Sequence, residues 1–167
     1  MEPGALRRAV ADTFMLTVDA HRGHPFQLAG TRVCAPFGQE LKNQSFIGLW
    51  RPECRDLMCT ILTVVIRESL GVVASANATT SEGAALEFEF VLLPLKQRGR
   101  TDGSLIGALA PRSAPDWLGL QAVGPLMLGP HRYLGHHSVA STMPCFAPEL
   151  PVRDQTHGLV VYQGGRS

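Results

Sequence analysis

The side chains in this 167-residue chain that are best suited to metal binding are its histidines and cysteines. His21 and His24 lie close together near the beginning, and His136 and His137 are adjacent further along, with Cys145 after them. Structural zinc sites repeat such ligands at regular spacing, often as C-x-x-C pairs. The four cysteines form no C-x-x-C pair, and no carboxylate or thiol recurs at a regular distance from the histidines. We therefore predict no metal site.

Nucleophilic catalysis needs a base within reach of the nucleophile. The chain contains no G-x-S-x-G motif, and no cysteine–histidine pairing follows from spacing. The loop over residues 99–103 carries two glycines, but no strand-to-helix transition follows it, so it does not match a phosphate-binding loop. We predict no catalytic residues and no enzyme activity. A small enzyme that uses His131 or His136 as its base is the weaker alternative.

Two carboxylates, Glu87 and Glu89, alternate with apolar residues in a segment that reads as a strand. Alternation places both on one side of the strand, because successive side chains point to opposite faces. We interpret them as part of a solvated face, with binding of a partner as the alternative.

Composition limits the classes of function. Net charge is +1 and the pI about 7.8, so there is no overall attraction to nucleic acid or to an anionic membrane. Charged residues make up 17%, which is low and favours an interface on the surface. The N-terminus lacks the apolar core of a signal peptide, and no window is long and apolar enough to cross a membrane. We expect a cytoplasmic protein.

Hydrophobic periodicity predicts strands and helices in a mixed order. We expect a short N-terminal helix over residues 5–12, and Thr31 and Ser45 are expected to be the N-caps of two short helices. The longest helix is predicted from Glu53 to Leu70, where Gly71 stops it. Five strands are predicted over residues 14–18, 26–29, 72–76, 86–93 and 105–110. This order fits an α+β fold with a five-stranded antiparallel sheet and helices packed on one face.

Three runs near the beginning of the chain resemble the signature of a bacterial PAS-like family, once catalogued as a domain of unknown function and found mostly in alphaproteobacteria. They cover residues 26–34, 37–41 and 46–50, and segments 92–95, 107–111 and 117–119 match its second half in the same order. The resemblance extends from Phe14 to Gly129. We therefore divide the chain into an N-terminal helical segment (1–13), a PAS-like domain (14–130) and a flexible C-terminal tail (131–167).

The resemblance implies a signalling module that binds small ligands between its sheet and helices or pairs with other proteins. We predict a non-catalytic regulator that acts by protein–protein contact in a bacterial phosphorelay, and a homodimer is a further expectation. The expected partner is a sensor histidine kinase, with no nucleic acid and no membrane insertion. A sensor of a small apolar or amphipathic molecule is the alternative.

The same resemblance sets expectations for cofactors. Haem-binding PAS domains offer a helix histidine, and the predicted long helix has none. Flavin photosensors carry an Asn-Cys-Arg motif, whereas Glu53 precedes Cys54 and Arg55 here. We therefore predict neither haem nor flavin. The candidate ligand pocket is lined by Cys34, Phe37, Phe46, Trp50, Leu62 and Phe90. The alternative is that these six residues fill the core and leave no pocket.

Overall fold

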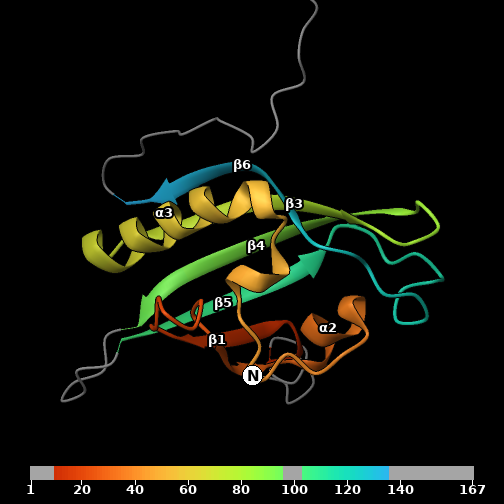
Figure 1. Cartoon of the computed structure of the whole chain (residues 1–167), viewed down its shortest axis with the longest axis horizontal. Coiled ribbons are helices and arrows are strands. Elements are labelled where there is room, and N and C mark those ends of the chain that lie inside the picture. The colour runs from red at the N-terminus through yellow and green to blue at the C-terminus, as the bar shows by residue number, and fades with distance from the viewer. Residues whose placement is uncertain (1–9, 96–102, 136–167) are drawn as a thin grey trace, which may run out of the picture.

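The computed structural model describes residues 10–95 and 103–135 of the chain (Figure 1). Its strands form one antiparallel sheet in the order β2-β1-β5-β4-β3-β6. The elements along the chain are β1 (Thr13–Thr17), β2 (Phe26–Ala29), α2 (Thr31–Cys34), the 3-10 helices η1 (Ala35–Phe37) and η2 (Ile47–Leu49), α3 (Pro52–Glu68), β3 (Gly71–Thr79), β4 (Ala85–Leu95), β5 (Ser104–Pro111) and β6 (Met127–Leu134). The predicted α+β fold is confirmed, but the sheet has six strands where five were expected.

The first two strands form the predicted N-terminal hairpin, and β2 has the predicted bounds. In the turn between them, Gly23 and His24 both adopt positive φ angles, 68° and 53°. The His24 Nδ1 atom accepts a hydrogen bond from the Asp19 amide at 3.3 Å. The hairpin thereby places the rings of Phe14 and Phe26 in the core, with 5.5 Å between their centroids.

Short helical turns follow the hairpin. Thr31 was predicted as an N-cap, but it is the first helical residue of α2, and Gly30 is the N-cap with no side-chain hydrogen bond. Gly38 ends η1 in the left-handed conformation, with φ of 62°, which glycine adopts at little cost. The N-cap of η2 is Phe46, one residue after the predicted Ser45, although the Ser45 hydroxyl accepts a hydrogen bond from the Gly48 amide at 3.0 Å.

Helix α3 begins at Pro52, which occupies the first turn without losing a hydrogen bond. It ends at Glu68 and not at the predicted Leu70, because Ser69 takes a left-handed conformation with φ of 54°. The helix lies across one face of the sheet and contacts β3, β4 and β6 (Figure 1). Its buried residues recur at helical spacing and are Cys54, Met58, Ile61, Leu62 and Val65.

Strands β3, β4 and β5 extend beyond their predicted ends. Pro94, which cannot donate to a strand ladder, lies beyond Leu92, the last β4 residue paired with β3. The proline is therefore tolerated inside a long strand. Of the predicted loop over residues 99–103, only Gly103 lies among the described residues.

The sixth strand is the largest departure from the prediction. The last predicted strand ended at residue 110, but β6 begins at Met127 and pairs with β3 as far as Leu134. The predicted domain boundary at residue 130 therefore falls inside a strand. Residues 136–167 of the predicted tail lie outside the described residues, as do residues 5–9 of the predicted N-terminal helix, of which Val10 and Ala11 are helical.

Candidate functional site

Three of the predicted pocket residues form a row of aromatic rings in the core. Phe46 precedes η2, Trp50 lies between η2 and α3, and Phe90 comes from β4. The Trp50 ring centroid is 5.8 Å from that of Phe46 and 5.4 Å from that of Phe90, within the range of direct aromatic contact. Phe46 continues the row toward the N-terminal hairpin, 5.9 Å from Phe14. The row therefore joins the helical layer to both halves of the sheet.

Two further pocket residues belong to the same core. Leu62 lies on the sheet-facing side of α3 and is fully buried. Phe37 at the end of η1 is also buried and stacks on Phe88 of β4, with 6.4 Å between centroids. The five apolar members thus lie in one hydrophobic cluster, as in a filled core.

Cys34 differs from the other five, because its side chain is only partly buried at the edge of this cluster. Its thiol lies 3.7 Å from Oε1 of Glu40. Burial, with the nearby Glu40 charge, raises the pKa of the Cys34 thiol, although a backbone hydrogen bond involving Leu41 acts in the opposite direction. Cys34 therefore stays protonated at neutral pH and is not an activated nucleophile.

Trp50 carries an unpaired polar atom inside the core. The residue is 1% exposed, and its indole Nε1 has no hydrogen-bond partner among the described residues. A buried donor without an acceptor costs about 1–3 kcal/mol. It is the one observation at the predicted pocket that points toward a ligand atom.

Among the described residues, the histidines belong to no cluster of metal-binding side chains. His131, the candidate base, is 5% exposed on β6, with its ring 6.0 Å from that of Tyr133. Burial lowers the pKa of His131, and its Nδ1 has no hydrogen-bond partner among the described residues. Within residues 10–95 and 103–135, no group of three or more histidine, cysteine or acidic side chains could hold a metal ion. His136, His137 and Cys145 lie outside that part of the chain.

The paired carboxylates lie on the sheet face turned away from the helices. Glu87 and Glu89 are exposed, and Arg112 approaches both, at 3.6 and 3.7 Å. Their strand neighbours Phe88 and Phe90 point the other way, into the core.

Between these carboxylates and the loop end of β4, the same face is apolar. We call this region the outer sheet face. It carries two rows of apolar side chains across neighbouring strands: Val73, Val91 and Ala108 in one, and Met15, Ile106 and Leu93 in the other. Five of the six are half-buried, and Leu93 is 41% exposed. The alternation within each strand indicates which residues share a face of that strand. Only the order of the strands in the sheet shows that these residues are neighbours.

A family model described as PAS domain matches residues 1–110. The chain belongs to the PAS domain family. The match overlaps most of the resemblance seen between Phe14 and Gly129, and it agrees with the α+β architecture. PAS domains are generally sensory or signalling domains, and that general role applies to this chain.

Two solved structures are similar to this PAS domain. One is an RNA-binding Light-Oxygen-Voltage receptor, 18% identical, with a TM-score of 0.48, where the match covers 65% of this chain and 32% of the receptor chain. The other is the light state of the blue-light photoreceptor Aureochrome1 LOV, 12% identical, with a TM-score of 0.48. This match covers 68% of this chain and 90% of the photoreceptor chain. The chain thus spans about a third of the first of these proteins. A search of curated proteins found no similar sequence. Among the described residues, no helix has the length and hydrophobicity needed to cross a membrane.

Proposed function

We propose that this PAS domain is a non-catalytic regulator that acts by protein–protein contact in a bacterial phosphorelay, in the branch of the family found mostly in alphaproteobacteria. The proposed partner is a sensor histidine kinase, and the chain itself is proposed to form a homodimer. The outer sheet face is the observation that carries this proposal.

The outer sheet face has the composition of a contact surface. The described helices pack against the opposite face, because the buried residues of α3 share the core with Phe88 and Phe90. Contiguous apolar side chains on a soluble domain mark sites of association. Glu87, Glu89 and Arg112 border the apolar rows on one side, which gives a partly exposed polar rim.

Substitution on this face provides the test. Leu93→Lys introduces a charge at the end of one apolar row of the proposed contact, at a position that is already 41% exposed, so the fold is kept. The matched control is Leu120→Lys, because Leu120 is 84% exposed on a loop away from the sheet.

We expect the wild-type chain to change the autophosphorylation rate of one kinase in a purified panel from the same organism, and Leu93→Lys to abolish that change while Leu120→Lys keeps it. Light scattering at several concentrations should show that the wild-type chain and Leu120→Lys self-associate and that Leu93→Lys does not. No effect on any kinase, together with a strict monomer, would overturn the proposal.

The second candidate is a small-molecule sensor, favoured by the unpaired Nε1 of Trp50. A ligand oxygen beside the row of aromatic rings would accept this hydrogen bond and would be held by apolar surface from Phe46 and Phe90. No haem or flavin is part of either proposal, since α3 contains no histidine and Glu53 precedes Cys54.

Native mass spectrometry of protein purified from its source tests this candidate. A retained mass that is lost in Trp50→Phe supports a ligand held by the indole. Protein that retains no mass and shows no thermal shift with a metabolite panel removes the sensor hypothesis. An absorption spectrum of the same sample should show no visible band.

A further inference from the structure

A cleft of about 370 Å³ lies at the end of β5, outside both the core and the outer sheet face. We call it the β5-end cleft. Ala35, Ala110 and Leu118 supply apolar surface, and Asp12, Arg32 and Arg112 supply charge. From these features we propose that the β5-end cleft binds an amphipathic carboxylate, a singly charged anion attached to a short apolar chain. This proposal is independent of the proposed function.

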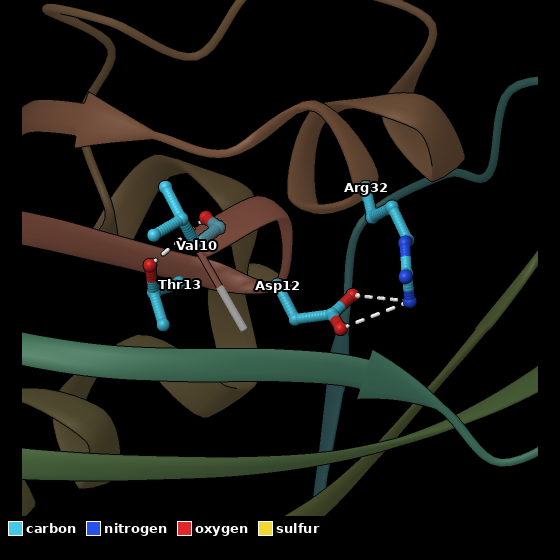
Figure 2. Close-up of polar contacts among 4 residues, drawn as sticks. All are labelled: Val10, Asp12, Thr13 and Arg32. Carbon is cyan, nitrogen blue, oxygen red and sulfur yellow. Dashed lines mark hydrogen bonds and ion pairs between the residues drawn. The ribbon is translucent and has the colours of Figure 1, made fainter. Parts of the chain in front are cut away.

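Arg32 and Asp12 both line the cleft, and their side chains point toward each other (Figure 2). One guanidinium nitrogen, Nη1, lies 3.0 Å from Oδ2 and 3.4 Å from Oδ1 of Asp12. The other donors of Arg32 make no hydrogen bond to a described residue. An arginine has five N–H donors arranged to bind a carboxylate with two parallel bonds, so this guanidinium can take a second carboxylate.

Asp12 is held in place by its backbone. Its carbonyl oxygen accepts a hydrogen bond from the Leu109 amide at 3.0 Å, and the Thr13 hydroxyl donates to the Val10 carbonyl at 2.9 Å in the turn before it (Figure 2). The Asp12–Arg32 pair is exposed on the Arg32 side, and exposed ion pairs contribute little to stability. A competing anion can therefore displace the Asp12 carboxylate from Arg32 at little cost in free energy.

The Arg112 side chain is held as loosely as that of Arg32. Its contacts to Glu87 and Glu89 are longer than 3.5 Å, and all three side chains are more than half exposed. The side chains that line the cleft carry one net positive charge, from two arginines and one aspartate, and Glu87 and Glu89 offset part of the Arg112 charge from outside the lining. This balance matches a monoanion better than a dianion such as phosphate, and the apolar surface adds affinity for a hydrocarbon chain.

A set of four probes separates the parts of the proposal: octanoate, acetate, octanol and inorganic phosphate, each titrated into the full chain by calorimetry. Octanoate carries one negative charge and a hydrocarbon chain. Acetate lacks the chain, octanol lacks the charge, and phosphate lacks the chain and carries a second negative charge. We expect octanoate to bind at least tenfold more tightly than the other three. Octanol binding as tightly as octanoate would overturn the proposal.

Two variants with opposite expected signs locate the site. Arg32→Gln should weaken octanoate binding about tenfold, the usual size of one charged hydrogen bond. Asp12→Asn should tighten it about threefold or more, because the competing carboxylate is removed, whereas a merely structural ion pair would predict no gain. Arg67→Gln, on an exposed residue of α3, is the control and should match the wild-type chain.

Backbone amide shifts from NMR give the location independently of affinity. Octanoate should shift the amides of Ala110 and of residues 112–114 more than the indole signal of Trp50. Octanoate binding that is within twofold of wild type in Arg32→Gln, or shifts centred on Trp50, would overturn the β5-end cleft as the site.

Discussion

At the scale of single residues, two histidines are held in surroundings that disfavour their charged form. His24 is buried in the turn before β2, and its Nδ1 accepts the Asp19 amide, which only a neutral ring can do. Burial lowers the pKa of His24, although the Asp19 charge partly offsets this. Burial also lowers the pKa of His131.

These shifts predict a loss of stability in mild acid. The unfolded histidines titrate at about 6.5, above their folded pKa, so the unfolded chain takes up protons first as the pH falls. Stability is therefore complete above about pH 6.5 and declines as the pH falls through the lowered folded pKa values. Thermal melts between pH 8 and pH 5 should show this decline, and it should be smaller in His24→Asn, because asparagine also tolerates positive φ. His21→Asn, on an exposed side chain, should follow the wild-type curve.

Gly107 on β5 has no room for a side chain. A β-carbon there would collide with the Phe14 ring and lie 2.7 Å from the Val91 carbonyl oxygen. Gly107→Ala should lower the free energy of unfolding by about 1–3 kcal/mol, the usual cost of overpacking. Urea titration measures this, with Ala110→Ser on the exposed part of the same strand as a control that changes it by less than about 0.5 kcal/mol. An unchanged Gly107→Ala midpoint would contradict the close contact with Phe14.

At the scale of elements, the contact between α3 and the sheet supplies much of the core. Leu62 is fully buried at the middle of this contact, whereas Leu120 is 84% exposed. Leu62→Ala should cost about 2–5 kcal/mol, through lost burial and the cavity left behind. Leu120→Ala makes the same chemical change and should cost less than about 0.5 kcal/mol. Equal losses for the two variants would show that α3 does not pack as described.

Strand β6 should behave as part of the same unit, although it lies at the edge of the sheet. Leu128 is 1% exposed and opposes Ala76 of β3. We expect Leu128→Ala to lower the unfolding free energy by about 2–5 kcal/mol without adding a second transition. Arg132→Ala, on an exposed residue of the same strand, is the control. A separate early transition in Leu128→Ala would instead mean that β6 unfolds by itself.

Elements with a strong local pattern could be predicted from the sequence. The bounds of β2, and the beginning of α3 to within one residue of Pro52, follow from alternation and from proline. The end of α3 could not be predicted, because Ser69 is not a residue type expected in the left-handed region. Strand β6 was missed because Gly129 and Pro130 resemble a loop, and because its register shifts opposite β3, which interrupts the alternation.

The candidate site could be predicted only in part. Large apolar residues such as Phe46 and Trp50 are identified as core by composition alone. The partial exposure of Cys34 depends on how α2 runs into η1, and the ion pair between Asp12 and Arg32 joins residues twenty positions apart. Neither arrangement has a local sequence signal.

At the scale of the whole molecule, the strand order makes folding depend on distant contacts. β1 lies between β2 and β5, so the N-terminal hairpin is completed by a strand from the other end of the domain. Sheets dominated by such pairings fold in about milliseconds to seconds, because distant segments must meet first. We expect one cooperative unfolding transition, with Trp50 fluorescence and far-ultraviolet circular dichroism changing together. Separate midpoints for the two signals would mean that the two halves of the sheet unfold independently.

The same strand order has a consequence while the protein is being made. Thr17 ends β1, and Ser104, at the beginning of the partner strand β5, is added much later. At about 5–20 residues per second, the ribosome needs roughly 4–17 s to make the chain between them. During that interval the growing polypeptide presents one uncovered backbone edge of β1, with Phe14 and Leu16 still lacking half of their eventual neighbours. The period of greatest exposure to misassembly and to chaperones therefore falls during synthesis, before the chain has reached its fifth strand.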